Sequence, residues 1–124
     1  MKRAILLTLA VLGLAWPGLV QAQDKFPNRP IKIIVPFGPG SATDVTARML
    51  GETMKNFTGQ QVVVENKPGA FGIIAIEEMV RAKPDGHTIL LQNVSTAAIT
   101  PQIYKKRFAI DYEKSVVPIS RIVE

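Results

Sequence analysis

Three loops of the chain are rich in glycine, proline and small polar residues, and each follows a short run of β-branched residues. They span residues 36–44, 66–72 and 93–96. When strands pair in parallel, the loops after their carboxyl ends gather in one crevice, and ligands bind there. Loops of this composition offer backbone N–H groups and little side-chain bulk, which suits a small anion. The pattern therefore favours a binding pocket over a catalytic centre.

The candidate ligand contacts are main-chain amides, hydroxyls and one side-chain amide. Gly38 and Gly40 let the backbone approach a ligand closely, and Pro36 and Pro39 stiffen the first loop, so that less entropy is lost on binding. The first two loops also lead into helices, whose N-terminal N–H groups favour negative charge. The predicted ligand-binding residues are Phe37, Gly40, Ser41, Ala42, Thr43, Asp44, Gly69, Ala70, Phe71, Gly72, Asn93, Ser95 and Thr96.

The charged residues near these loops leave alternatives open. Asp44 either contacts a donor group of the ligand or bonds loop N–H groups and complements the start of the helix; an acid beside an anion site favours the second role. Arg48 falls one turn into the helix, which favours a solvated position over ligand contact. Lys67 lies in the second loop, where contact with an acid is the lesser alternative.

No catalytic or metal-binding constellation emerges from the sequence. Gly38 and Gly40 lack the third glycine of a nucleotide-binding fingerprint, because Thr43 stands in its place. The chain has no Gly-x-Ser-x-Gly motif and no cysteine, and His87 is its only histidine, with only Asp85 nearby as an acid. We therefore expect no enzyme, no metal and no cofactor. The competing interpretation, an exported hydrolase or nucleotide-dependent protein, lacks a nucleophile–base pair.

The elements that position these loops alternate between strand and helix. Short apolar runs between turn residues predict strands at residues 31–35, 62–65 and 88–91. A capping hydroxyl at Ser41 or Thr43 and a left-handed glycine at Gly59 predict the bounds of the first helix. Strand–helix–strand order with short links predicts an α/β fold with a parallel sheet flanked by helices.

The second half of the chain continues this alternation. Apolar residues at helical spacing over 73–80 predict a second helix. A short helix capped at residue 95 or 96 is expected to stop before Pro101, with residues 103–104 packed against the sheet. Residues 116–123 are expected to begin a fourth strand.

The first 22 residues have the pattern of a secretory signal peptide. Lys2 and Arg3 precede an apolar run of roughly a dozen residues, shorter than the ~20 that span a bilayer, and Ala22 supplies the small residue before a cleavage site. We expect export, cleavage after about Ala22 and a mature domain over residues 23–124. A retained membrane anchor is the lesser alternative.

Charge and composition exclude other classes of partner. The formal net charge is +5, and removal of Lys2 and Arg3 with the signal takes away two positive charges and leaves +3. Lys105–Arg107 is the only basic cluster, with Phe108 as its only aromatic neighbour on the far side, so no nucleic-acid surface is expected. Because the chain has no cysteine, its stability must come from packing rather than disulfides.

Several segments, taken in order, resemble one known family, the periplasmic solute-binding receptors of tripartite tricarboxylate transporters, also called Bug receptors. The resemblance covers essentially all of the chain after the signal. The segments that carry it are Phe26–Ile31, Ile34–Gly40, Thr43–Val45, Ala47-Arg48, Val64–Ala70, Gly72, Lys83–Thr88 and Ile99–Pro101.

The resemblance implies a periplasmic, two-lobed, hinged binding protein of the type II, Venus-flytrap kind. By this analogy the chain supplies an incomplete amino-terminal lobe and stops near the crossing into the second lobe. The implied ligand is a small carboxylate, the implied partners are the membrane permease subunits of the transporter, and the complete protein is expected to be a monomer. The alternative is a truncated fragment that does not bind, or an interaction module without transport activity.

Departures from the family pattern bear on the ligand. Ser41, Phe71 and Ala75 stand where glycine is common in the family, and Ile73 stands where a polar residue is frequent. Phe71 either stacks on a flat acid or fills the cleft, and both alternatives stay open. As a hypothesis, the pocket prefers an aromatic or branched monocarboxylate over citrate.

Overall fold

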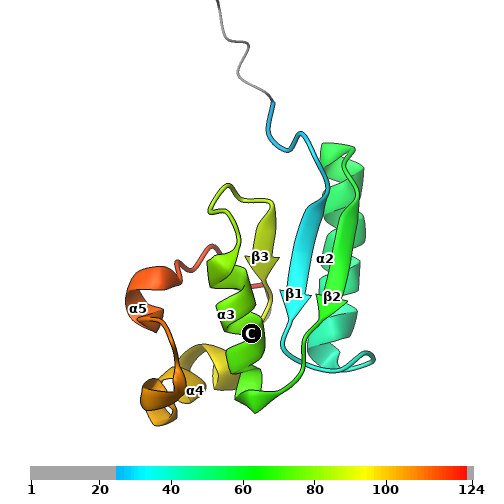
Figure 1. The fold of residues 1–124 in the computed structure, drawn as a ribbon. Coiled ribbons are helices and arrows are strands. Elements are labelled where there is room, and N and C mark those ends of the chain that lie inside the picture. The colour runs from blue at the N-terminus through cyan, green and yellow to red at the C-terminus, as the bar shows by residue number, and fades with distance from the viewer. Residues whose placement is uncertain (1–24, 123–124) are drawn as a thin grey trace, which may run out of the picture.

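A three-stranded parallel sheet forms the centre of the fold in the computed structural model, which describes residues 25–122 (Figure 1). Its strands are β1 (Ile31–Val35), β2 (Val62–Asn66) and β3 (Thr88–Leu90), in the order β2-β1-β3. Ile33 pairs with Val64 on one side and with Ile89 on the other. The expected parallel sheet flanked by helices is confirmed, and the predicted signal peptide and its cleavage site lie outside the described residues.

Helices cover both faces of the central strand β1. The odd-numbered residues Ile33 and Val35 pack with Ala47 of α2 (Ala42–Thr58). On the other face, Lys32 reaches Glu78 of α3 (Ile73–Arg81), with 3.6 Å between the charged atoms. Ile33 and Ile34 point to opposite faces and neither is exposed to solvent, so β1 is buried on both sides.

Helix α2 begins and ends where its capping residues predict. The Ser41 hydroxyl accepts a hydrogen bond from the Asp44 amide, and Gly59 adopts a left-handed conformation with φ of 72°. Gly51 in the helix interior has a packing reason, because a Cβ there would lie 3.2 Å from Cγ1 of Val62. The small residue therefore lets α2 approach β2 closely.

The segment after β3 departs from the expectation at Pro101. A wide helical turn, η2 (Ser95–Ile99), runs directly into α4 (Thr100–Ile103), so the helix does not stop before the proline. Pro101 lies in the first turn of α4, and because it has no N–H it donates no hydrogen bond back into η2. Ile103 was expected on the sheet but is 67% exposed.

The remaining elements are short. They are η1 (Ala70–Gly72), η3 (Lys105–Arg107) and α5 (Tyr112–Ser115). The strand expected from residue 116 is absent over residues 116–122, where the backbone forms no regular element. An apolar run becomes a strand only where a neighbouring strand supplies hydrogen-bond partners, and among the described residues none lies beside it.

Candidate functional site

The three predicted loops meet at the carboxyl end of the sheet and enclose one open cavity of about 330 Å³. Because β1 is central, its loop lies between the loops that follow β2 and β3. Each of the three loops contributes to the wall. The lining residues are Pro36, Phe37, Gly38, Pro68, Gly69, Phe71, Gly72, Ser95, Thr96 and Thr100.

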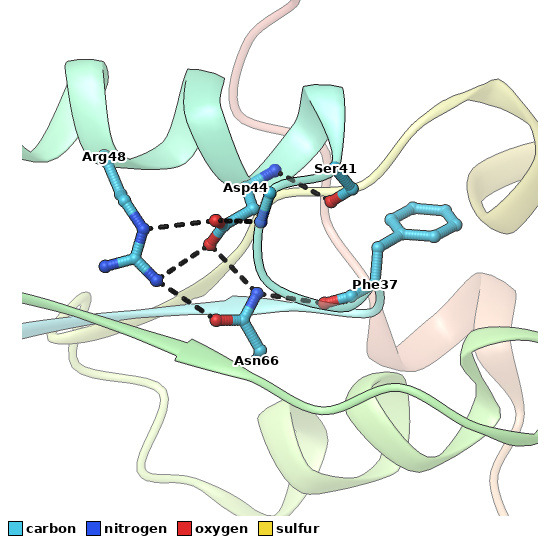
Figure 2. Close-up of polar contacts among 6 residues, drawn as sticks. Phe37, Ser41, Asp44, Arg48 and Asn66 are labelled. Carbon is cyan, nitrogen blue, oxygen red and sulfur yellow. Dashed lines mark hydrogen bonds and ion pairs between the residues drawn. The ribbon is translucent and has the colours of Figure 1, made fainter.

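A buried carboxylate organises the first loop, between β1 and α2 (Figure 2). Asp44 is 3% exposed, and its Oδ2 accepts a hydrogen bond from the Gly40 amide at 2.9 Å. Its Oδ1 accepts one from Nδ2 of Asn66 at 2.9 Å, and Arg48 donates to both oxygens. These contacts, that with Arg48 above all, lower the pKa of Asp44 from 3.8 to about 2. The carboxylate is therefore ionised and engaged within the protein.

Asn66 ties this loop to the end of β2. Its Nδ2 also donates to the carbonyl of Phe37 at 2.9 Å, and its Oδ1 accepts from Arg48 at 3.2 Å. One side chain thus joins the loop, the helix start and the neighbouring strand (Figure 2). We call Asp44, Arg48 and Asn66 the polar hub. The sequence analysis did not predict that Asn66 belongs to this hub. The one feature in the sequence that could have indicated it is the position of Asn66 at the carboxyl end of a strand.

Several amides of the first loop have no acceptor within residues 25–122. The Gly40 amide donates to Asp44 and the Ser41 amide donates to Gly38. By contrast, no described residue accepts from the amides of Phe37, Gly38, Ala42 and Thr43. The last two belong to the first turn of α2, whose N–H groups have no intrahelical partner. These amides remain available to an anion.

The second loop, between β2 and α3, has an unusual run of left-handed residues. Gly69, Ala70, Phe71 and Gly72 have φ values of 130°, 45°, 56° and 90°. The Gly72 amide donates to the Gly69 carbonyl, whereas no acceptor among the described residues faces the amides of Gly69, Ala70 and Phe71. The Phe71 carbonyl accepts from the Thr100 hydroxyl at 3.0 Å. The loop is therefore anchored from α4 while the amides of Gly69, Ala70 and Phe71 stay unpaired within the described residues.

The third loop, after β3, closes the cavity from the other side. Thr96 is 3% exposed, its amide donates to Oδ1 of Asn93 at 3.1 Å, and its hydroxyl donates to the Asn93 carbonyl at 3.2 Å. Gly72 of the second loop lies so close to Thr96 that a Cβ on residue 72 would be 2.7 Å from Cγ2 of Thr96. The second and third loops thus touch through a glycine.

The structure brings together only part of the predicted site. Phe37, Gly69, Phe71, Gly72, Ser95 and Thr96 line the cavity. The other predicted contacts belong to the same loops but not to its wall: Gly40, Ser41, Ala42, Thr43, Asp44, Ala70 and Asn93. The sequence analysis did not include Thr100 in the site. Its hydroxyl reaches the second loop only because the wide helical turn η2 precedes it, and the sequence did not predict that turn.

Within residues 25–122, no charged side chain lines the cavity. Nζ of Lys67, which precedes the lining residue Pro68 in the chain, lies 2.6 Å from Oε1 of Glu65 and 3.2 Å from Oε2 of Glu78. Glu65 is the main reason that the pKa of Lys67 is raised. Arg48 is similarly paired with Asp44. The arrangement offers neutral N–H donors and hydroxyls to an acid, with the neighbouring cations already matched by carboxylates.

His87 lies at the opposite end of the sheet, just before β3. Its ring is buried against Phe26, and its Nδ1 lies 3.2 Å from Oδ1 of Asp85. It therefore takes no part in the cavity. Residues 25–122 contain no cluster of three or more side chains suited to a metal ion. No helix in that range is long and apolar enough to cross a membrane.

Comparison with known proteins gives the same family at several levels. Residues 46–124 match the family described as "Tripartite tricarboxylate transporter family receptor". The chain is 40% identical over 118 residues to a UPF0065 protein of Bordetella pertussis, and the match covers 94% of this chain and 36% of the relative. The chain thus spans about a third of the length of the curated relatives that it matches.

Two solved structures share the fold and a substantial part of the sequence. One, described as a periplasmic transporter, is 44% identical with a TM-score of 0.66 and covers 70% of this chain and 29% of its own. The other is MatC from Rhodopseudomonas palustris with bound malate, 33% identical with a TM-score of 0.65, covering 71% of this chain and 30% of its own. The sheet and its loops are therefore those of a periplasmic binding-protein domain.

Proposed function

Because this chain belongs to the receptor family of tripartite tricarboxylate transporters, we propose that it captures a small carboxylate at the cavity and presents it to a membrane transporter. The family consists of receptors, so the expectation of a receptor rather than an enzyme is confirmed at that level. The proposal includes export to the periplasm, where receptors of this type meet their ligands.

One observation carries the proposal: three loops converge on one cavity while several of their amides lack an acceptor within residues 25–122. An N–H group without a partner gains most from an ionised acceptor, because charge-assisted hydrogen bonds are about twice as strong as neutral ones. The positive end of α2 adds to this attraction. The proposed contacts of the carboxylate are the Ser95 hydroxyl and the unpaired amides of the first two loops. Those of Ala42 and Thr43 lie outside the cavity wall, and the ligand is proposed to reach them at the start of α2.

The ligand of a structural neighbour supports the same chemistry. MatC was solved with malate, a small dicarboxylate. In this chain we propose that a carboxylate of the same size binds from the open side of the cavity. A domain that grips its ligand from one side gains few contacts, so we expect a dissociation constant in the millimolar range, about −4 kcal/mol.

The proposal is tested by following backbone amides in ¹H–¹⁵N spectra of the full chain during titration with malate and, separately, with its neutral diamide. Saturable shifts at Phe37, Gly38 and Gly69 with malate alone support the site. Gly59 is the internal control, because its amide already donates to Lys55 at 2.8 Å. The absence of a saturable shift at the loop amides with malate and also with the monocarboxylate benzoate would overturn the proposal.

A matched pair of variants isolates one amide. Ala42→Pro removes an N–H at the first helical position, where proline is tolerated, and the preceding Ser41 already has the extended conformation that proline requires, with ψ of 156°. Ala42→Gly keeps the N–H. Loss of one charge-assisted bond predicts roughly 3- to 10-fold weaker malate binding for the proline variant. Equal affinities of the two variants would remove Ala42 from the site.

A further inference from the structure

Phe71 is the one large apolar side chain that the second loop holds at the rim of the cavity. It lines the cavity, and the residue is 63% exposed. Its backbone has φ of 56° and ψ of 33°, a left-handed conformation that residues other than glycine seldom adopt. Because Phe71 is largely exposed, burial of its side chain contributes little to stability. The position of its ring therefore depends on the residues that it contacts.

The ring of Phe71 is held in place by a second aromatic residue. Tyr104, at the end of α4, stacks on it with ring centroids 4.8 Å apart and planes 15° apart. The guanidinium carbon of Arg107 lies 5.3 Å from the centroid of the same tyrosine ring. The Thr100 hydroxyl also fixes the Phe71 carbonyl. Backbone and ring are thus both restrained before any ligand arrives.

The cavity around this ring suits an acid of low charge. Its volume of about 330 Å³ is at the small end of ligand pockets, and none of the described residues that line it is charged. Amides can hold one carboxylate, but further carboxylates would lose water without finding a cation among the lining residues. An apolar, flat remainder would instead lie against Phe71 and the prolines of the wall.

We propose that Phe71, backed by Tyr104, is a stacking wall that makes this site select aromatic monocarboxylates. This inference rests on the proposed carboxylate site and specifies its ligand class. The carboxylate is held by the amides of the first two loops, and the ring of the ligand packs on the pre-positioned face of Phe71. Because Phe71 does not have to be ordered on binding, the stacking is gained at little entropic cost.

The test compares benzoate with cyclohexanecarboxylate, which has the same carboxylate and a ring of similar size without π electrons. Both are titrated into the full chain, with the loop amides as the readout. We expect benzoate to bind about 3- to 10-fold more tightly. Intermolecular NOEs between benzoate and the Phe71 ring protons are expected in the wild-type chain. Because the NOE measurement uses the wild-type chain, its result does not depend on whether a variant folds.

Two variants locate the selectivity. Phe71→Leu keeps an apolar side chain and removes the ring, so benzoate and cyclohexanecarboxylate should bind equally while the amide shifts persist. Tyr104→Leu removes only the backing ring and should reduce the preference in part. Equal affinities in the wild type, or a preference unchanged in Phe71→Leu, would overturn this inference and leave the carboxylate site standing. Absence of loop-amide shifts with either acid would overturn both.

Discussion

The β1–α2 loop and the β2–α3 loop lie at the same edge of the sheet and both leave amides unpaired, but they are held in different ways. In the first, a buried carboxylate gathers donors: Asp44 accepts from Gly40, Asn66 and Arg48. The loop has one left-handed residue, Gly40. Side-chain hydrogen bonds therefore set its shape, and the backbone carries little strain.

The second loop has no such acceptor at its centre. Neither η1 nor α3 has a side-chain cap, and the backbone turns through consecutive left-handed residues, two of which are not glycine. Its shape depends on contacts from elsewhere in the chain, namely the Thr100 hydroxyl and the Tyr104 ring. Side-chain hydrogen bonds thus hold the first loop, whereas tertiary contacts that offset backbone strain hold the second.

The largest expected effect comes from breaking the acceptor of the first loop. Asp44→Asn keeps the shape of the side chain but replaces an acceptor with a donor that faces Gly40, Asn66 or Arg48. We expect the Tm to fall by roughly 10 °C or more, because buried donors lose their partner. The matched control is Asp111→Asn, since Asp111 is an exposed residue paired only with Lys114 among charged side chains in residues 25–122. Thermal unfolding of both variants should separate them clearly, and equal Tm changes would contradict the hub.

The stability of the second loop should be most sensitive to substitution where Gly72 contacts Thr96 of the third loop. Gly72→Ala places a methyl group 2.7 Å from Cγ2 of Thr96 at φ of 90°. We expect the free energy of unfolding in urea to fall by roughly 2–3 kcal/mol. Gly38→Ala is the control, because nothing lies within 4 Å of a Cβ there. Thr96→Ser removes the contacted methyl group and should restore part of the loss; no recovery would assign the effect to the backbone alone.

The polar hub also predicts how acid affects stability. Folding lowers the pKa of Asp44 from 3.8 to about 2, chiefly through Arg48. The stabilisation is therefore complete above pH 3.8 and is lost as the pH falls through that value towards 2. The Tm difference between wild type and Asp44→Asn should shrink between about pH 5 and about pH 2. A Tm difference that stays constant over this range would show that the negative charge of Asp44 does not contribute to the stability of the polar hub.

The smallest effect tests the strain in the second loop. Ala70 has φ of 45°, so Ala70→Gly relieves an unfavourable conformation and should raise the free energy of unfolding by roughly 0.5 kcal/mol. Ala98→Gly, in the helical turn η2, should lower it by about 1 kcal/mol, because glycine is disfavoured in a helix. If both substitutions destabilise equally, the left-handed backbone of Ala70 carries no strain.

Local signals explain why the first loop was more predictable than the second. Ser41 and Gly59 bound α2 as expected, because a cap interacts with residues only a few positions away. The favoured role of Asp44, bonding loop amides, agrees with its contact to Gly40. By contrast, Phe71 and Tyr104 lie far apart in the chain, and their stacking depends on how α4 folds back on the second loop.

The C-terminal part shows where local patterns mislead. Proline was expected to end a helix before Pro101, but the wide turn η2 delivers that residue to the first turn of α4. An apolar run from residue 116 was expected to form a strand, although strand formation depends on a neighbour that the run itself cannot provide. Both errors arise because position in the fold, rather than composition, decides the outcome.

The amino-acid pattern by itself determined the parallel α/β alternation, the bounds of α2 and the loops that meet at the carboxyl end of the sheet, since each follows from hydrophobic periodicity and short-range capping. Only the tertiary structure decided which amides remain unpaired, that Asn66 binds the carboxylate of Asp44, and that Tyr104 stacks on Phe71. Those contacts join residues distant in sequence, and no local preference encodes which of them will meet.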